Sequence, residues 1–573
     1  MKYFIPEWDD RVDPNYDFIN DNHSQKHKKN PVANGAYLWD VFGLSNVPID
    51  GVLVSRMTIA QNKKKYEQAV QEGIHKVLRL PPDFEILGDC GAFGYVDKKL
   101  PLFDPIEILQ YYHDLGFNYG VTVDHLVVAQ FEKDREERIR ITFQNGVKAY
   151  QEWLKKFKED FQLVVAIQGW DVSDYLKMYR DYLDLGATYL AFGGLARSPT
   201  SFSLRLIDEL IKEIKGSTRI PSYLHFFGLA RVALFPQFQE LEDLGVEVGF
   251  DSASYLRKAW LSTAAAQLNY LTLEKRGYTA IRIPFVNLKD RRRKNQTPLE
   301  GTYEKQLRYL EQECLNRLRQ YDRGETHFES VISILSEFNK ALGKGPKLIK
   351  FYERTLEDQP WKMCTCPICR KLGIDVVIFR GNNRNRRRGF HNTYVFYTIL
   401  QNPELWQKAL KKRLVEHFAD LATQKKGERV LIITECTKEK QGYDASVKST
   451  AKEMYKGRLF QTVRKYCEAM KFDYVIFSAK YGLLFPDDEI EGYEKMLKTK
   501  EDVRQIQPLV EEKLRPLLHK YDKIIVIAGK TYRDVLQSLM DERFFVIKSK
   551  GYGDLCRIIK KSTPSSLTLL EFA

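Results

Sequence analysis

Three cysteines and one histidine have the spacing of a closed zinc site. Cys364, Cys366 and Cys369 lie within a stretch of six residues, and 21 residues separate Cys369 from His391. Three thiolates and an imidazole complete the tetrahedral coordination of Zn²⁺ and leave no position open for a substrate. We therefore predict a structural zinc ion, with unrelated free cysteines as the alternative, and expect the chemistry of the protein to lie elsewhere in the chain.

Another set of polar and small residues follows strand-like segments in the first half of the chain. Each member stands at or just after the carboxyl end of a predicted strand, and barrel enzymes place their sites at that end of the sheet. An aspartate at such a position also commonly caps the next helix, so helix caps are the alternative for Asp124 and Asp251. The set consists of Asp89, Asp124, Gln168, Gly193, Gly194, His225 and Asp251.

Short strand-like segments alternate with amphipathic helical segments over the first 280 residues, which is typical of parallel α/β sheets. Three of the helical segments end on Leu-Gly, where glycine allows the left-handed turn into the next strand. We predict a (β/α)8 TIM-like barrel. A doubly wound open sheet is the alternative, but the Gly-x-Gly-x-x-Gly turn of a dinucleotide fold is missing after the first strand. The eight strand candidates lie near residues 49–55, 85–88, 119–123, 162–167, 188–192, 221–226, 246–250 and 278–283.

The length of 573 residues indicates roughly two to four domains. We expect an N-terminal extension over residues 1–45, the barrel over 46–350, a zinc-binding subdomain with a basic loop over 351–425, and a C-terminal α/β domain over 426–573. No apolar run is long enough to span a bilayer, the first residues lack the apolar core of a signal peptide, and the other cysteines are scattered. These features predict a soluble protein of the cytoplasm, or of the host's cytoplasm if a phage encodes it.

The net charge of +14 favours a polyanionic partner. Two arginine clusters concentrate this charge, and the second falls between the zinc cysteines and His391. The metal would then fix the ends of a flexible basic loop that grips nucleic-acid phosphates. A solvated run of charges is the alternative. The clusters are Arg291, Arg292 and Arg293, and then Arg380, Arg384, Arg386, Arg387 and Arg388.

The last third of the chain predicts a small Rossmann-like α/β domain. Apolar segments at 430–434, 474–478 and 524–528 are separated by helical sequence, as expected for buried parallel strands. The loops after the first two segments carry Lys438, Lys440 and Lys480, at the end of the sheet where such folds bind ligands. These lysines could meet phosphate; a structural or docking domain is the alternative.

Four segments resemble, in the same order, motifs of the tRNA-guanine transglycosylase superfamily. They are similar to its Asp-Ser-Gly-Gly-Phe, Val-Gln-Gly, Gly-Gly-Leu-Ala and Phe-Asp motifs, and the cysteine spacing matches its zinc site. Residues 4–18 look most like the DpdA branch, which is associated with inserting 7-deazaguanines into DNA. The chain departs from the tRNA enzymes at Ser252-Ala253-Ser254, where they have Pro-Thr-Arg, and at His125, where they have Glu. The four segments are Asp89–Phe93, Val165–Gly169, Phe192–Ala196 and Phe250–Asp251.

The resemblance implies exchange of guanine in DNA for a 7-deazaguanine, such as 7-cyano-7-deazaguanine, through a covalent aspartyl-glycosyl intermediate. It implies zinc as a structural ion, no organic cofactor, DNA or alternatively tRNA as partner, and no membrane; a helper protein or a homodimer stays open. The alternatives are a tRNA-guanine transglycosylase and a non-catalytic, zinc-containing nucleic-acid-binding subunit. The implied roles are Asp251 as nucleophile, Asp89 as general acid and base, and Asp124, Gln168, Gly193, Gly194 and Leu195 as binders of the base.

Overall fold

The structure of the protein is a computed structural model. It describes residues 1–260 except 61 and 199, residues 268–273, 277–286 and 301–407, residues 429–547 except 471, 498, 519, 541 and 542, and positions 551, 553, 555, 556 and 559. The chain forms two compact units. The first comprises Met1–Val128, Lys133–Ala196 and Glu213–Trp406, and the second comprises Ala129–Glu132, Arg197–Lys212 and Gln407–Ala573.

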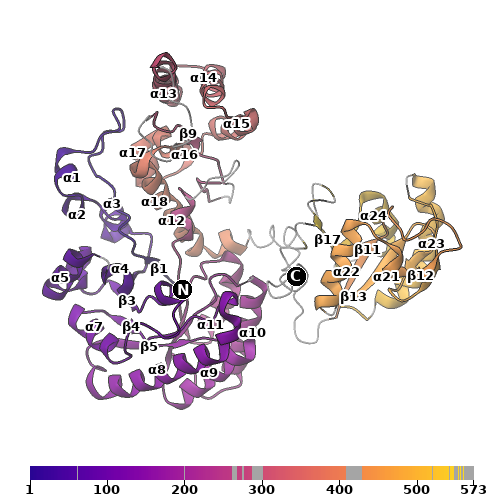
Figure 1. Cartoon of the computed structure of the whole chain (residues 1–573), viewed down its shortest axis with the longest axis horizontal. Helices are drawn as coiled ribbons and strands as arrows, with labels where there is room; N and C mark the ends of the chain where they lie inside the picture. The colour runs from indigo at the N-terminus through magenta and orange to yellow at the C-terminus, as the bar shows by residue number, and fades with distance from the viewer. Residues whose placement is uncertain are drawn as a thin grey trace. The chain divides into compact units, whose positions relative to one another are not determined.

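Eight parallel strands close into a barrel in chain order, and the first strand pairs with the last (Figure 1). A helical segment precedes most strands, so the alternation seen in the sequence is the alternation of a (β/α)8 barrel. The closed sheet confirms the barrel and excludes the doubly wound open sheet. The strands are β1 (Lys2–Pro6), β2 (Gly51–Ser55), β3 (Glu85–Asp89), β4 (Tyr119–Val121), β5 (Gln162–Ile167), β6 (Tyr189–Phe192), β7 (Tyr223–Phe226) and β8 (Glu247–Asp251).

One of the eight strand predictions is wrong. The segment at 278–283 contributes β9 (Ile281–Arg282), which pairs with β10 (Ile378–Phe379) outside the barrel. Its place in the barrel is taken by β1, so the expectation that residues 1–45 form an extension outside the barrel is wrong for their first strand. Both segments are short and apolar, and only their pairing partners distinguish them.

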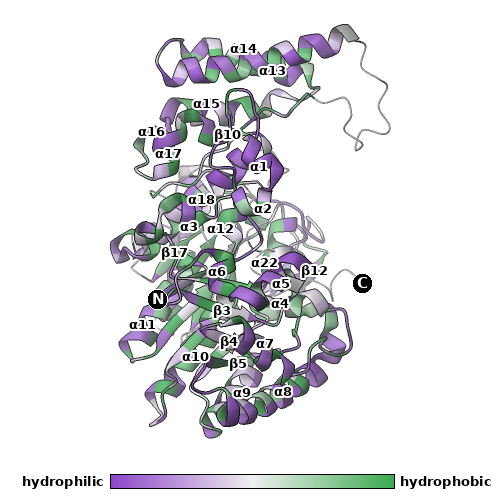
Figure 2. Cartoon of the chain, turned by 90° about the vertical axis from the view of Figure 1, so that its left-hand side faces the viewer, coloured by the Kyte–Doolittle hydropathy of each residue, from purple (hydrophilic) through white to green (hydrophobic). Residues whose placement is uncertain are grey.

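The barrel interior is apolar. Figure 2 shows the strands β3, β4 and β5 largely in the hydrophobic colour, whereas helices α8 and α9 carry many hydrophilic residues. Side chains from the strands β1 to β7 fill the centre, as expected for a barrel of this size. Phe4 belongs to this cluster, which explains why the first strand is apolar. The other buried members are Leu53, Leu87, Val121, Val164, Ala166, Ala191 and Tyr223.

The described part of the first 260 residues contains twelve α-helices. They are α1 (Gln25–Lys29), α2 (Pro31–Asn34), α3 (Leu38–Phe42), α4 (Arg56–Ala60), α5 (Lys63–Glu72), α6 (Ile74–Leu78), α7 (Glu107–Leu115), α8 (Arg135–Lys156), α9 (Val172–Asp184), α10 (Thr200–Lys215), α11 (Phe235–Asp243) and α12 (Ser254–Lys258). Gly116 ends α7 in the left-handed conformation, with φ of 72°, as the Leu-Gly pattern predicts. No described helix is both long and apolar enough to cross a membrane.

A helical subdomain follows the barrel. It consists of α13 (Gly301–Asp322), α14 (Phe328–Ala341), α15 (Ile349–Asp358), α16 (Pro360–Met363), α17 (Pro367–Leu372) and α18 (Gly381–Leu400). The zinc cysteines lie on and just before α17, and His391 lies on α18. The boundaries expected for this subdomain and for the other domains remain predictions.

The flexible basic loop predicted at residues 380–388 is wrong. Arg380 is the N-cap of α18, and the other four arginines lie within that helix. Arg384 and Arg388 are fully buried, with 0% of their surface exposed, and Arg380 and Arg387 have only 4% exposed. These four enclosed side chains cannot reach the phosphates of a nucleic acid. The Arg386 side chain is 30% exposed, and its contact with a nucleic acid stays a prediction. Arg291, Arg292 and Arg293, the other predicted basic cluster, lie outside the described residues.

The buried arginines instead join the N-terminal segment to the helical subdomain. Arg384 pairs with Asp21 and Asp375, and Arg380 pairs with Asp21 as well. Arg387 donates to the backbone oxygen of Asp13 at 2.7 Å. A sequence rich in Asn, Gly and Arg is typical of a loop, and its acidic partner Asp21 lies more than 350 residues away, so the pattern gives no sign of a buried helix.

The second unit contains a five-stranded sheet in the order β14-β13-β11-β16-β17. The three strands predicted from the sequence are found as β11 (Val430–Glu435), β13 (Asp473–Ser478) and β16 (Lys523–Ile527), and they are parallel. β17 (Phe544–Val546) continues the parallel order and β14 (Gly482–Leu484) adds an antiparallel edge. The remaining elements are α21 (Ala451–Met454), α22 (Arg458–Met470), α23 (Lys500–Leu518), α24 (Lys530–Leu536), and the antiparallel pair β12 (Lys448–Thr450) and β15 (Glu489–Glu491).

Candidate active site and zinc centre

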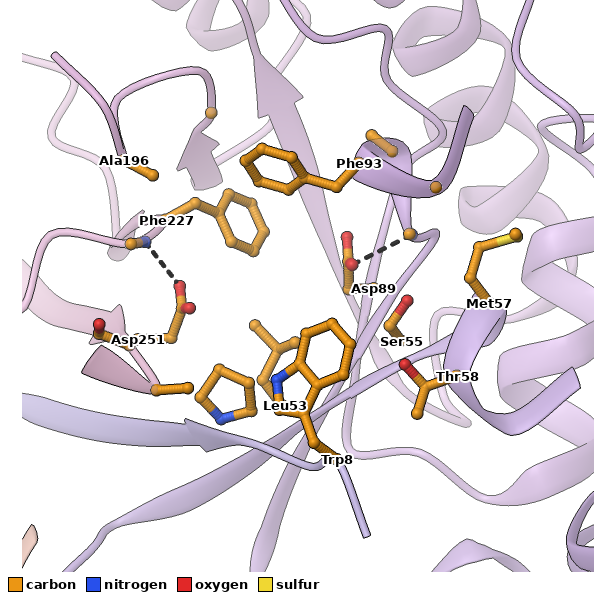
Figure 3. A pocket seen from close by; sticks show the side chains of 18 of the residues that line it. Trp8, Leu53, Ser55, Met57, Thr58, Asp89, Phe93, Ala196, Phe227 and Asp251 are labelled. Atoms are coloured by element: carbon orange, nitrogen blue, oxygen red, sulfur yellow. Dashed lines mark hydrogen bonds between the residues drawn. The ribbon is translucent and has the colours of Figure 1, made fainter. Parts of the chain in front are cut away.

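A cavity of about 690 Å³ opens at the carboxyl ends of the barrel strands. Figure 3 shows Asp89 and Asp251 on opposite sides of this cavity. Asp89 ends β3 and Asp251 ends β8, and Asp124 follows β4. The strand-end pattern therefore brings all three predicted carboxylates to one rim. Five of the predicted residues line the cavity: Asp89, Asp124, Gly193, Gly194 and Asp251.

Asp251 is held by two donors on the same oxygen. Its Oδ1 accepts a hydrogen bond from the Gly228 backbone N–H at 3.0 Å and lies 3.2 Å from Nε2 of His225. The other ring nitrogen of His225, Nδ1, lies 2.8 Å from the Tyr223 hydroxyl. Since a carboxylate only accepts, Nε2 carries the proton and Nδ1 accepts from Tyr223. Among the described residues, none donates a hydrogen bond to Oδ2 of Asp251.

Of the histidine and tyrosine behind Asp251, the strand-end pattern includes His225 but gives it no role, and it misses Tyr223. His225 stands at a strand end without a motif that indicates its role, and Tyr223 carries no motif. Gly249 makes room for their chain of hydrogen bonds, because a Cβ there would lie 2.0 Å from the Tyr223 hydroxyl oxygen. The small residue two positions before Asp251 is the only local signal of this arrangement.

Asp89 is a carboxyl whose proton is easily gained and lost near neutral pH. Burial and the neighbouring carboxylates of Asp124 and Asp251 raise its pKa to about 7, because both effects disfavour the ionised form. Its Oδ2 accepts a hydrogen bond from the Gly91 N–H at 3.0 Å, which works in the opposite direction. A group with this pKa, in a cavity, is suited to general acid and base catalysis.

Asp124 is fixed by side chains that lie behind it. Gln168 donates from Nε2 to Oδ2 at 2.6 Å, and the Cys90 thiol donates to Oδ1 at 3.2 Å. Burial raises the pKa of Asp124, and these two hydrogen bonds oppose the rise. Gln168 is 0% exposed and its Oε1 accepts from the Val127 N–H. Gln168 therefore orients Asp124 and does not itself line the cavity.

The glycine pair lies against this amide. A Cβ on Gly193 would be 2.1 Å from Nε2 of Gln168, and Gly194 has φ of 75°, so side chains at either position would displace the pair. The next residue, Leu195, is buried behind the cavity, and its backbone oxygen accepts from Nη2 of Arg231 at 3.3 Å. Of the predicted base-binding residues, Gln168 and Leu195 are thus supporting residues in this geometry.

Aromatic side chains form part of the cavity wall. Figure 3 shows the rings of Trp8, Phe93 and Phe227 around the space between the two aspartates. Phe93 is 59% exposed and Trp8 is 47% exposed, although both are large apolar side chains. Sequence reasoning misses Trp8 because it does not assign the preceding strand to the barrel.

Two cationic side chains hold the segment that carries Trp8. Lys65 is buried and donates from Nζ to Glu7 and to Asp9, each at 2.8 Å. The guanidinium of Arg257 lies 4.5 Å from the ring centroid of Trp8, a cation–π arrangement. The tryptophan is therefore positioned at the mouth of the cavity from both sides.

The predicted zinc ligands converge. Cys366 is the N-cap of α17, and Pro367 opens that helix, which brings Cys369 back toward Cys366. The Sγ atoms of Cys364, Cys366 and Cys369 lie 3.5, 3.5 and 3.4 Å from Nδ1 of His391. Zinc bonds of about 2.3 Å to sulfur and about 2.0 Å to nitrogen at a tetrahedral angle require a separation of about 3.5 Å. The four donors therefore fit a zinc ion.

The imidazole of this site is oriented from behind. Nε2 of His391 lies 2.8 Å from the backbone oxygen of Leu271, to which it donates. This hydrogen bond leaves Nδ1 free of its proton and directed at the thiolates. The ring of Tyr270 stacks on His391 with centroids 4.0 Å apart and an interplanar angle of 12°. The surroundings of the site thus also fit a structural metal.

Comparison with known proteins settles the family. The chain is 31% identical over 427 residues to a DNA-guanine transglycosylase of Salmonella montevideo, and the match covers 70% of this chain and 97% of that protein. The chain belongs to the tRNA-guanine transglycosylase superfamily, in its DpdA-like branch. This assignment agrees with the motifs at Asp89, Gly193 and Asp251, which meet in one cavity.

Relatives named for tRNA are more distant. The chain is 24% identical over 239 residues to a tRNA-guanine(15) transglycosylase of Methanopyrus kandleri, and the match covers 40% of this chain and 49% of that protein. It is 23% identical over 214 residues to the tRNA-guanine(15) transglycosylase of Pyrococcus furiosus, covering 37% of this chain and 34% of that protein. Residues 430–551 match a family of unknown function, DUF6884.

Proposed function

We propose that this protein is a transglycosylase that exchanges guanine in DNA for a 7-deazaguanine base, such as 7-cyano-7-deazaguanine. The observation that carries the proposal is the pair Asp89 and Asp251, which flank one cavity at the catalytic end of the barrel in a chain of this superfamily. The reaction runs through a covalent bond between Asp251 and the sugar, which preserves the energy of the glycosidic bond for the incoming base.

In the first half-reaction, Oδ2 of Asp251 attacks C1′ of the target deoxyguanosine. The C1′–N9 bond breaks, its electron pair leaves with the guanine, and Asp89 transfers its proton to the departing base. The hydrogen bonds from His225 and Gly228 to Oδ1 support this assignment, because they orient the carboxylate and leave Oδ2 for the attack.

In the second half-reaction, the incoming base loses its N9 proton to the Asp89 carboxylate. Its N9 then attacks C1′, and the bond between C1′ and Asp251 breaks to regenerate the carboxylate. Two displacements at C1′ retain the configuration of the sugar, as in retaining glycosidases. A pKa near 7 supports both roles of Asp89, since the group must donate a proton in one step and accept one in the next.

The cavity wall suits a planar base. Phe93 and Phe227 offer ring faces on which a purine can stack. Asp124 accepts hydrogen bonds from the N–H groups of the base, and Gln168 keeps its carboxylate in place. Gly193 and Gly194 let the backbone approach the base closely.

A duplex substrate must expose its target nucleotide first. Extrusion of one nucleotide costs a few kcal/mol, and contacts with the DNA backbone at the cavity mouth offset this cost. Arg257 and Trp8 stand at that mouth, where a cation can meet a phosphate and an indole can stack on a base. These two side chains, rather than the buried arginines of α18, are therefore the proposed DNA contacts.

Zinc is proposed as a structural ion held by Cys364, Cys366, Cys369 and His391. A closed Cys3His site supplies folding energy and no open coordination position for a substrate. No step of the proposed reaction passes through it, and no organic cofactor is required. We place the reaction in the cytoplasm, where the scattered cysteines stay reduced.

Base exchange can be measured directly. Radiolabelled guanine is incubated with the protein and either duplex DNA or tRNA, and 7-cyano-7-deazaguanine is then tested by mass spectrometry of the nucleosides. We expect incorporation into DNA by the wild type and none by Asp251→Asn. Incorporation into tRNA alone would establish the second candidate, a tRNA-guanine transglycosylase, which the similarity to the two archaeal proteins favours. Incorporation into neither would point to a non-catalytic binding subunit.

A further inference from the structure

A second cluster of polar side chains lies in the second unit. Cys436 follows β11 and Ser478 ends β13, and the two strands are joined there by the Cys436 N–H, which donates to the Phe477 oxygen at 2.8 Å. β11 has β13 on one side and β16 on the other, so the strand order reverses at β11. Open α/β sheets bind ligands beyond the carboxyl ends of their strands, which is where the loops after β11 and β13 lie.

Tyr493 is the centre of this cluster. Its hydroxyl lies 2.8 Å from Oγ of Ser478 and 2.8 Å from the Tyr455 hydroxyl, and the residue is 5% exposed. The Nζ atoms of Lys440 and Lys480 lie 4.5 and 5.6 Å from the centroid of that ring. Two ammonium groups thus approach the same tyrosine, one from the loop after β11 and one from the loop after β13.

Lys440 is a buried cation with no counter-ion among the residues that the structure describes. It is 8% exposed, and its Nζ has a single hydrogen bond, at 3.4 Å, to the backbone oxygen of Lys438. Among the described residues, no carboxylate oxygen lies within 4.0 Å of it or of Nζ of Lys480. Glu494 acts on Lys440 from beyond that distance, and burial still lowers the pKa of the lysine.

Other lysines of the same unit are paired. Lys448 lies 3.4 Å from Glu491, Lys452 lies 2.5 Å from Asp487, and Lys456 lies 3.7 Å from Glu453. These side chains are on the surface, where a partner matters little. Lys440 needs an anion more than these surface lysines do, because an uncompensated buried charge is costly, yet no described carboxylate pairs with it.

We propose that Lys440 and Lys480 bind the terminal phosphate of a small ligand, such as a nucleoside 5′-monophosphate. A phosphate dianion supplies the missing charge and accepts hydrogen bonds from both ammonium groups. The burial of Lys440 favours a terminal phosphate over the internal phosphodiester of a nucleic acid, because only one oxygen of a terminal phosphate carries a substituent. Tyr443 lies at the edge of this site, 5.9 Å from Nζ of Lys440 and 50% exposed, where its ring can pack on a base.

The proposal does not rest on the proposed base exchange, because all residues of this site belong to the second unit. Calorimetric titration of the full chain with inorganic phosphate and with GMP tests it. We expect binding by the wild type and a loss of affinity of about tenfold or more in Lys440→Gln, since a charge-assisted hydrogen bond is removed. Lys456→Gln is the matched control and should bind within about twofold of the wild type.

A second variant, Lys480→Gln, distinguishes the loss of a phosphate contact from misfolding. Lys480 lies on the surface, so its replacement leaves no buried gap. We expect it to weaken GMP binding as well, with an unchanged circular dichroism spectrum. No binding of GMP or phosphate by the wild type, or equal binding by the wild type and both glutamine variants, would overturn the proposal. A third outcome would also overturn the proposal: an oligonucleotide without terminal phosphates binds, this binding requires Lys440, and neither GMP nor phosphate binds. That result would identify a nucleic-acid docking site instead.

Discussion

Replacing Asp89 with Asn should make the barrel unit more stable at alkaline pH while it removes activity. The pKa of this carboxyl is raised from 3.8 to about 7 by burial and by its acidic neighbours. A group with a raised folded-state pKa favours the folded state at low pH, and this contribution is lost as pH rises toward and through 7. The ionised aspartate therefore opposes folding above neutrality, and the neutral amide does not.

The size of the effect follows from the same pKa values. A carboxyl that titrates at 3.8 when unfolded and at about 7 when folded costs about 4 kcal/mol at pH 8 and less than about 2 kcal/mol at pH 5. Asp89 faces a water-accessible cavity, so we expect about half of these values. Asp89→Asn should thus be more stable than the wild type by about 2 kcal/mol at pH 8 and by less than about 1 kcal/mol at pH 5.

The assay is urea denaturation followed by tryptophan fluorescence. All seven tryptophans of the chain lie between Trp8 and Trp406, so the signal reports the unit that contains the barrel. The amide oxygen of Asn can still accept from the Gly91 N–H, which keeps the local backbone in place. Asp97→Asn is the control, because that side chain is 65% exposed and should change stability little at either pH. A variant that is equally stable as the wild type at pH 8, or destabilised by the same amount at both pH values, would refute the reasoning.

Three other predictions concern the rest of the first unit. Asp251→Asn should lower base exchange by more than about a thousandfold with unchanged urea denaturation, because the amide cannot form the covalent bond; exchange at the wild-type rate would remove Asp251 from the mechanism. Arg384→Met should lower the free energy of unfolding by about 3 kcal/mol, since Asp375 and Asp21 lose a buried partner. The control is Arg386→Met, at a side chain that is 30% exposed, which should lower it by less than about 1 kcal/mol in the same assay. Metal analysis should find one zinc per chain, and Cys366→Ser should lose it and lower the melting temperature; a variant that keeps its zinc would show that the ion is bound elsewhere.

The first unit is largely predictable from local patterns. The strand-end positions of Asp89, Asp124 and Asp251 are enough to place all three on one rim, because residues at the carboxyl ends of parallel strands converge in a barrel. The zinc ligands are equally predictable from the sequence, since three of them lie within six residues, at and just before the start of one helix. In both cases, the position of each residue can be predicted from the few residues next to it in the sequence.

Gln168 and the first barrel strand show the limits of prediction from local patterns. The amide of Gln168, at a strand end, could face the cavity or hold a neighbouring side chain. Only the position of Asp124, 44 residues away in the sequence, determines that the amide binds this carboxylate. The strand Lys2–Pro6 and the segment at 281–282 are both short and apolar, and pairing with β8 selects the first for the barrel. Neither segment by itself specifies the distant strand with which it pairs, or the register of that pairing.

The sequence by itself determined the superfamily motifs, the barrel and the zinc donors, because each rests on spacing along the chain. Only the tertiary structure decided the role of the arginines at 380–388. Arg384 meets Asp21 across 363 positions of sequence, and the two side chains bury one another's charge. Whether a run of arginines binds a nucleic acid or forms buried ion pairs depends on partners that the run does not contain, and those partners are brought to it only by folding.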